Sequence, residues 1–271
     1  MLKLHVMRGL AVIAMAVGAV VGQAGVAGAV SAVPATGPTA TSGMAADPAC
    51  NNNGTSSWDG WGWIPDSSNH LYGIRAPVKR RVDGLLCTDT GNDSTSSVWI
   101  AIQSTVAEHF VQIGFIHKFV NGAGTWCRFW ENNNNLSQSY DCGTDSDDTQ
   151  VYFKIEQQCT AFGCTYVIYD CGTGGNFTNC NPMDSSIPLF SSPEAAVNSE
   201  AHFWCVVRMM GQGSDRVWYG NDTWATSIED NSGWSKNRNW GNYGGNQCTS
   251  DYMKDNAGGG LLRTWDSRNT S

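Results

Sequence analysis

The strongest constraint on this fold is a two-residue alternation of side-chain type that recurs along most of the chain. Val, Ile, Phe, Tyr and Trp alternate with other residues in short stretches that Asn, Gly, Ser and Asp separate. Such residues suit a pleated surface, and successive residues of a strand point to opposite faces. The pattern predicts strands at residues 71–75, 97–103, 109–119, 125–131, 151–157, 165–170, 201–209 and 216–219.

One segment has the pattern of a helix. Ser192–Glu200 (SPEAAVNSE) offers Ser192 as a cap and Pro193 in the first turn. The rest consists of strands and polar turns, which is typical of two packed antiparallel sheets. We therefore expect an all-β fold, a jelly-roll-like (concanavalin A-like) sandwich braced by disulfides.

The N-terminus predicts export. Lys3 and Arg8 precede the apolar segment 10–21, and Val30-Ser31-Ala32 offers a small-residue cleavage site. A membrane anchor at 10–32 is the alternative interpretation. We expect a signal peptide at 1–32, a flexible leader at 33–57, rich in Ala, Thr, Gly, Pro and Ser, and one sandwich domain at 58–271. The mature protein is then expected to be secreted, monomeric and free of the membrane.

The cysteines support the same compartment. Ten cysteines occur, none in a CxxC pair, and an even number in an exported chain favours disulfides over metal. Local spacing favours four pairs: Cys127–Cys142, Cys159–Cys164, Cys171–Cys180 and Cys205–Cys248. The acidic stretch Asp141–Asp148 is either a calcium loop or a solvated turn, and the turn is favoured because the EF-hand pattern is missing. We expect no cofactor and no metal.

Charge and aromatic content exclude two classes of protein. The formal net charge is −8, which argues against a nucleic-acid partner. Twelve Trp and only 15% charged residues argue against a disordered chain.

The alternation divides each strand into two faces. Val98, Ile100 and Ile102 would face the core, and Trp99 would lie on the opposite face. That opposite face mixes aromatic and polar residues, which is typical of a ligand surface; its members are Trp99, Phe110, Gln112, His202, Trp204 and Arg208. The alternative is that loops bury this face as a second small core.

Two functions follow for such a face. Sugars lay their C–H faces on aromatic rings and pair their hydroxyls with polar side chains, so the first is binding of an extracellular carbohydrate or polymer. Besides this face, the expected loop Trp58–Trp63 and the stretch Trp234–Tyr243 are also aromatic and polar. A secreted interaction or inhibitor protein is a further alternative.

The second function rests on a resemblance. The stretches 98–102 (VWIAI), 111–115 (VQIGF) and 129–131 (FWE) resemble the glutamic peptidases of the eqolisin type, which are secreted β-sandwich endopeptidases. The resemblance implies that Gln112 and Glu200 are catalytic, that Glu131 is a supporting acid and that Trp99 lies in the active site. Gln103 and Ile116 stand where that family carries Asp.

A Glu carboxylate can act as general base on a water, while a Gln amide orients that water and stabilises the oxyanion. The sequence therefore favours a protein that binds an extracellular carbohydrate or polymer, with a hydrolase of polypeptides as the close alternative. It leaves open whether the chain is an enzyme.

Overall fold

The fold is described from a computed structural model. It describes residues 56–67, 69–79, 81, 94–104, 109–120, 123–133, 137–142, 148–202, 210, 212, 214–221, 223–244 and 252–267. These residues form sixteen strands, every pair of which is antiparallel, so the all-β prediction is confirmed. Within these ranges no helix is long and apolar enough to cross a membrane.

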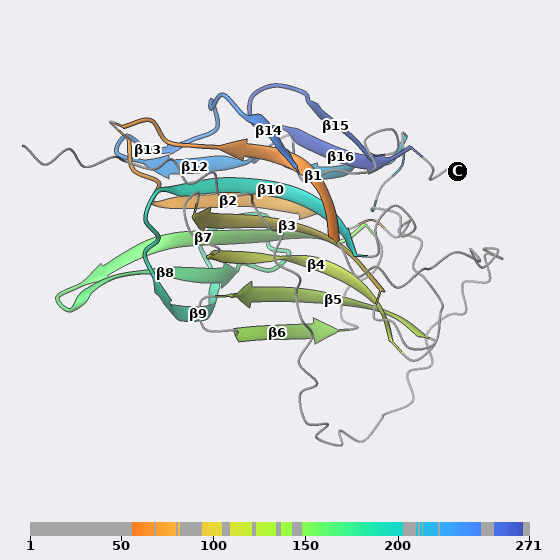
Figure 1. The fold of residues 1–271 in the computed structure, drawn as a ribbon, viewed down its shortest axis with the longest axis horizontal. Helices are drawn as coiled ribbons and strands as arrows, with labels where there is room; N and C mark the ends of the chain where they lie inside the picture. Colours follow the sequence, from red (N-terminus) through yellow and green to blue (C-terminus); the bar gives the residue numbers. More distant parts are fainter. Residues whose placement is uncertain are drawn as a thin grey trace, which may run out of the picture. The chain divides into compact units, whose positions relative to one another are not determined.

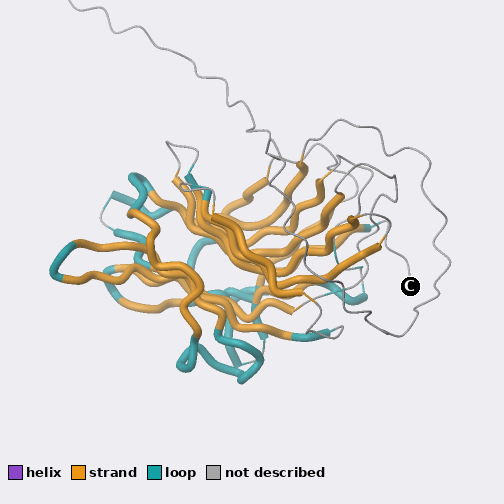
Figure 2. Tube along the Cα trace, turned by 90° about the horizontal axis from the view of Figure 1, so that it is seen from below, coloured by secondary structure: helices purple, strands orange, loops and turns teal. Residues whose placement is uncertain are grey.

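The strands build two sheets, drawn in Figures 1 and 2. The seven-stranded sheet has, in order, β14 (Gly241–Gly244), β1 (Ser56–Trp63), β10 (Pro193–His202), β3 (Ser94–Ser104), β4 (Phe110–Val120), β5 (Ala123–Asn132) and β6 (Ser137–Cys142).

The nine-stranded sheet has, in order, β15 (Tyr252–Asn256), β16 (Leu262–Asp266), β11 (Val217–Tyr219), β2 (Gly73–Lys79), β7 (Gln150–Thr160), β8 (Gly163–Asp170) and β9 (Asn181–Pro188). Beside β2 lies β12 (Ser227–Asp230), and β13 (Gly233–Ser235) pairs with β12. The chain crosses between the two sheets several times, and one of these crossings joins β9 to β10.

One hydrophobic core fills the space between the sheets. Both sheets contribute fully buried side chains to it, among them Ile100 and Ile113 from one sheet and Phe153 and Ile155 from the other. These are the residues that the alternation assigns to the core. The other parity of each strand therefore points away from it, and we call the side of the seven-stranded sheet that faces away from this core its outer face.

The predicted helix at Ser192–Glu200 is wrong. The segment is most of strand β10, which lies between β1 and β3 and pairs with both. Ala195 and Val197 face the core with no exposed surface, whereas Ala196 belongs to a small cluster on the outer face. Burial on both sides outweighs the helix propensity of the two alanines. The predicted loop at Trp58–Trp63 is likewise part of a strand, β1.

Three of the four expected disulfides are confirmed. Cys127–Cys142 joins β5 to β6, Cys159–Cys164 closes the β7–β8 hairpin, and Cys171–Cys180 closes the loop before β9. The pair Cys205–Cys248 lies outside the described residues. Three disulfides fit an extracellular protein.

Many tryptophans pack against cations. On the outer face of the nine-stranded sheet, the Arg75 guanidinium lies 4.2 Å from the Trp234 ring centre and 5.6 Å from that of Trp224. Similar contacts join Arg216 to Trp265 and Arg263 to Trp218. These rings are occupied within the fold, which removes them from the candidates for ligand binding.

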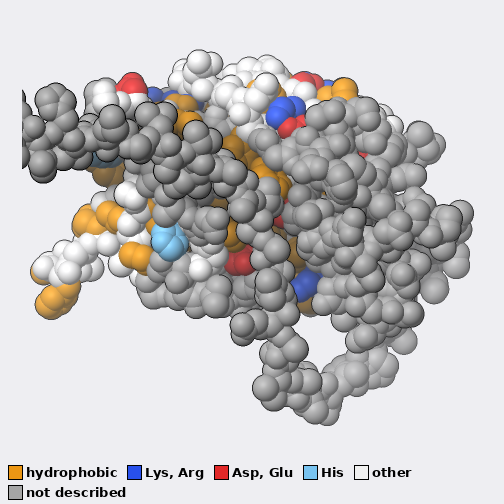
Figure 3. Space-filling view, viewed as in Figure 1, with side chains coloured by type: hydrophobic (Ala, Val, Ile, Leu, Met, Phe, Trp, Pro, Cys, Tyr) orange, Lys and Arg blue, Asp and Glu red, His pale blue; other side chains and the backbone are white. Residues whose placement is uncertain are grey.

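Surface charge is dispersed. Figure 3 shows acidic and basic side chains of described residues singly or in small groups, among hydrophobic and neutral atoms. Among the described residues visible in this view, the basic side chains form no extended patch for a polyanion.

The disulfides predict unequal losses of stability. Chain entropy predicts that Ser substitution of both Cys127 and Cys142, 15 residues apart, costs about 3 kcal/mol of unfolding free energy. The same change at Cys159 and Cys164, five residues apart, should cost about 2 kcal/mol. Urea unfolding of both double variants measures the difference, and a larger loss for the shorter loop would contradict this ranking.

Candidate functional site

The outer face of the seven-stranded sheet gathers most of the described residues that the sequence predicts for a site. Directly opposed residues of antiparallel strands point to the same face. Gln112 of β4 lies opposite Glu131 of β5 and Ala101 of β3. Trp99 lies opposite Gly114 on one side and Asn198 on the other. The register thus groups Trp99, Gln112 and Glu131 on one face.

The first polar pair joins β4 to β5. The Gln112 side-chain amide donates a hydrogen bond to Glu131, with 2.8 Å between Nε2 and Oε2. Gln112 is 7% exposed, so this bond fixes the amide in a largely water-free place. Within the described part of the chain its amide oxygen and second N–H have no further partner, which leaves them for a water or a ligand.

The second polar pair joins β3 to β10. The Trp99 indole donates to Glu200, with 3.2 Å between Nε1 and Oε2. Because β10 is extended, Glu200 lies on the outer face, as the sequence predicts for an extended segment. Trp99 is only 6% exposed and packs in a small cluster with Ala101, Ile116, Cys127, Phe129 and Ala196. Its ring is therefore not an open stacking platform.

Gly114 makes room for that tryptophan. A Cβ on Gly114 would lie 2.0 Å from the Val98 carbonyl oxygen and 2.7 Å from the Trp99 Cα. No side chain fits there. The Gly of the Gln112-Ile113-Gly114 motif is thus explained by the close approach of the β3 backbone at Val98 and Trp99.

A third polar group contains a carboxylate that the sequence analysis missed. Glu194 of β10 lies opposite Gln103 of β3 on the outer face, and the Gln103 amide donates to Glu194. The same amide donates to the Tyr243 hydroxyl of β14 at 2.5 Å. Glu194 is 8% exposed. Burial raises its pKa above the ordinary 4.5, although the hydrogen bond from Gln103 opposes the shift.

The sequence analysis missed Glu194 because this residue falls in the first turn of the helix predicted at Ser192–Glu200. An extended reading of the same segment would have placed it, with Glu200, on one face. Tyr243 was included only as part of an aromatic stretch. Its ring lies over Gly62 of β1, with 3.2 Å between its Cβ and a Cβ built on that glycine, and burial raises its pKa to about 12.

The register also ranks the carboxylates by their distance from Gln112. Gln112, Ala101 and Ala196 form one cross-strand row. Glu194 is two residues from Ala196 and Glu200 is four. At about 3.4 Å per residue and 4.8 Å per strand, the Cα atoms of Gln112 and Glu194 are roughly 12 Å apart, against roughly 17 Å for Glu200.

A buried amide completes the face. Asn198 of β10 lies between Trp99 and Gly60 in its row and is fully buried. Among the described residues, neither its Nδ2 nor its Oδ1 has a hydrogen-bond partner. An unpaired buried amide is costly in an ordinary core and is more frequent at functional sites.

The remaining expected residues are partly outside the described chain. Phe110 lies opposite Gln103 on the outer face and is half-buried. His202 of β10 lies opposite Ser56 of β1, but its side chain is not described. Trp204 and Arg208 lie outside the described residues. In the acidic stretch, Asp148 pairs with Arg81 and Lys79. No group of three or more His, Cys, Asp or Glu within the described ranges is placed to hold a metal ion.

Comparison with known proteins adds no relative. No protein-family model and no curated protein matches this sequence.

Gly114 provides a direct test of this geometry. Gly114→Ala should lower the unfolding free energy by about 1–3 kcal/mol, because the added methyl meets backbone rather than a movable side chain. Gly174→Ala is the matched control, since its Cβ would meet nothing within 4 Å. Thermal or urea unfolding measures both, and equal stability of the two variants would contradict the close approach at Gly114.

Proposed function

We propose that this chain is a secreted hydrolase of polypeptides that works as a glutamic-type peptidase on the outer face of the seven-stranded sheet. One observation carries the proposal. A buried carboxyl with a raised pKa, Glu194, lies on the same face as a fixed amide, Gln112, in the neighbouring cross-strand row. A carboxyl with a shifted pKa near an oriented donor is the combination that acid–base catalysis requires.

The chemistry balances without a cofactor. Ionised Glu194 takes a proton from a water as its oxygen bonds to the peptide carbonyl carbon. The Gln112 amide donates a hydrogen bond to the oxyanion that develops. Glu194 then returns the proton to the leaving nitrogen as the carbon–nitrogen bond breaks. Glu131 holds the Gln112 amide in position throughout.

Of the two carboxylates of β10 we assign the base to Glu194. It is the nearer to Gln112 by register, and burial raises its pKa. Glu200, the candidate from the resemblance, accepts a hydrogen bond from Trp99. In this proposal Glu200 positions the Trp99 ring. Substitution of Glu194 and of Glu200 separates the role of base from the role of positioning residue.

The finer fold assignment is also part of the proposal. We assign the two sheets to a jelly-roll-like (concanavalin A-like) sandwich. Support comes from the wholly antiparallel pairing, the single core between the sheets and the strand order, in which β10 lies between β1 and β3. Export is supported by the three disulfides and by the N-terminal sequence pattern.

Binding of a glycan or another polymer is the second candidate. Its support is a pair of partly exposed aromatic residues on the outer face, Trp58 and Phe110, which are half-buried. Such rings suit stacking on sugars or on apolar side chains of a polypeptide. In the hydrolase they would hold the substrate chain.

Cleavage of unfolded casein between pH 2 and 7 tests the hydrolase. Glu194→Gln should lower the rate by roughly 10²–10⁴-fold, because the base is lost. Gln112→Ala should lower it by roughly 10²–10³-fold, because one oxyanion donor is lost. Glu200→Gln is the matched control, and we expect a smaller loss.

Two outcomes would contradict the assignment. Activity that survives both Glu194→Gln and Gln112→Ala would exclude this mechanism. A well-folded protein that cleaves nothing but is retained on insoluble polysaccharide would favour the binding candidate instead.

The raised pKa of Glu194 predicts how activity and stability depend on pH. The acid limb of kcat/KM should lie above pH 4.5, since the base must be ionised. Below the unfolded-state pKa the neutral acid costs the fold nothing. As pH rises through the higher folded-state pKa, the folded protein loses stability because a buried charge forms. The Tm of Glu194→Gln should therefore increase relative to the Tm of the wild type as pH rises above 4.5. A Tm difference that does not change with pH would contradict the raised pKa of Glu194.

A further inference from the structure

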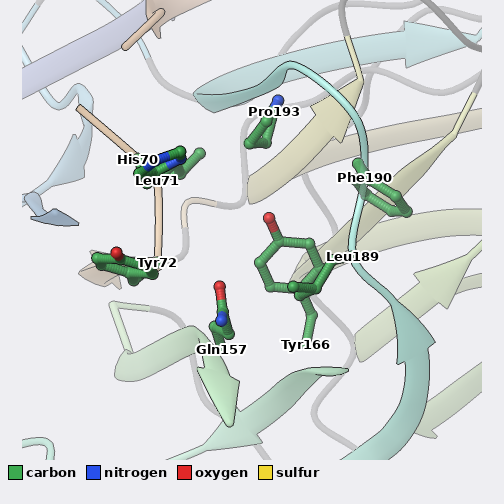
Figure 4. A pocket seen from close by; sticks show the side chains of 8 residues that line it. All are labelled: His70, Leu71, Tyr72, Gln157, Tyr166, Leu189, Phe190 and Pro193. Atoms are coloured by element: carbon green, nitrogen blue, oxygen red, sulfur yellow. The ribbon is translucent and has the colours of Figure 1, made fainter. Parts of the chain in front are cut away.

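A pocket opens at one end of the sandwich, on the inner side of the sheets and apart from the outer face. Its volume is about 260 Å³. Five segments line it: the chain leading into β2, strand β7, strand β8, the β9–β10 connection and the first residue of β10 (Figure 4). The lining residues are His70, Leu71, Tyr72, Gln157, Tyr166, Leu189, Phe190 and Pro193.

The pocket is mainly apolar and of a size for one ring. Leucine, proline and aromatic side chains form most of its wall. A dry cavity of about 150 Å³ holds benzene, so about 260 Å³ holds one six-membered ring and its linker but little more. This matches a single large side chain of a polypeptide rather than a drug-sized molecule or an oligosaccharide.

The Tyr166 hydroxyl is a polar group in the otherwise mainly apolar wall of the pocket. Tyr166 is 1% exposed, and its hydroxyl points into the hollow, toward the side on which Pro193 lies (Figure 4). Tyr166 and Gln157 are directly opposed in the β7–β8 pair, so both face inward at the open end of the core. Within the described part of the chain the Tyr166 hydroxyl has no hydrogen-bond partner, and burial raises its pKa, which keeps it a neutral donor.

A hydroxyl that faces an open pocket and has no partner among the described residues can donate to a ligand that supplies an acceptor. We propose that this pocket binds a phenol-type ring, the side chain of a tyrosine in a polypeptide, with the ring among Leu189, Phe190 and Pro193. The bound phenol oxygen accepts a hydrogen bond from Tyr166. A phenylalanine ring fits the same space but leaves the Tyr166 hydroxyl unpaired.

The position of the pocket connects it to the outer face. Pro193 lines the pocket, and the next residue, Glu194, points to the opposite side of the same strand. A polypeptide held by a tyrosine here therefore lies within a few residues of Glu194. The role of the pocket in choosing the cleavage site rests on the proposed function, whereas its binding of a tyrosine side chain does not.

Binding is tested without reference to catalysis. The full mature protein is titrated with N-acetyl-tyrosine amide, N-acetyl-phenylalanine amide and N-acetyl-alanine amide by NMR. The tyrosine amide should bind roughly threefold to tenfold more tightly than the phenylalanine amide, the range expected for one neutral hydrogen bond. The alanine amide should show no saturable binding.

Two variants locate the effect. Tyr166→Phe keeps the ring and removes the donor, so it should abolish the preference for tyrosine and leave binding of phenylalanine unchanged. Leu189→Trp fills the mouth of the pocket from a position that is 40% exposed, so it should fold normally and abolish binding of both. A preference that survives Tyr166→Phe, equal binding of the alanine amide, or binding unaffected by Leu189→Trp would overturn the proposal.

Cleavage-site mapping on casein provides the second readout. Sites within a few residues of tyrosine should be enriched for the wild type and lose that enrichment in Leu189→Trp. Binding of the tyrosine amide without any casein cleavage would uphold the pocket while the hydrolase fails. Cleavage with no tyrosine enrichment and no amide binding would overturn the pocket and leave the hydrolase standing.

Discussion

Burial of aliphatic side chains between the two sheets is the interaction on which the rest of this structure depends. Val98, Ile100 and Ile102 in β3 have no exposed surface, nor do Phe153 and Ile155 in β7 across the core. A strand alternates its side chains, so fixing one parity in the core fixes the other on the outside. The register of β3 and β4 therefore places Trp99 and Gln112 on the outer face, whatever those residues do there.

The outer face is unusual because its polar groups are paired with one another and largely withdrawn from water. Amide–carboxylate contacts join Gln112 to Glu131 and Gln103 to Glu194, and an indole–carboxylate contact joins Trp99 to Glu200. Hydrogen bonds of this kind strengthen in a place of low polarity, and they hold each group in one orientation. Glycine at 114 allows β3 to approach closely, and alanine at 196 packs in the cluster that holds the Trp99 ring.

Aromatic residues are used in two different ways. On the nine-stranded sheet they surround guanidinium groups, as Trp234 and Phe177 do with Arg75. On the seven-stranded sheet Trp99 is a structural ring that carries a donor, and the partly exposed rings lie around the polar groups. The high tryptophan content thus divides between closing the fold and shaping one face, and only the second use bears on the proposed function.

The sequence alone determined the all-β class, three disulfides and the sorting of β3, β4 and β7 into core and outer faces. Each of these follows from local information: alternation within a strand, or a short spacing between cysteines. Tertiary structure decided that Ser192–Glu200 is a strand, because the Ala-rich segment has weak alternation and only burial between β1 and β3 makes it extended. That decision brought Glu194 to Gln103 and Glu200 to Trp99 across about 90–100 residues of sequence. No local pattern reports such pairings, because they depend on which strands become neighbours.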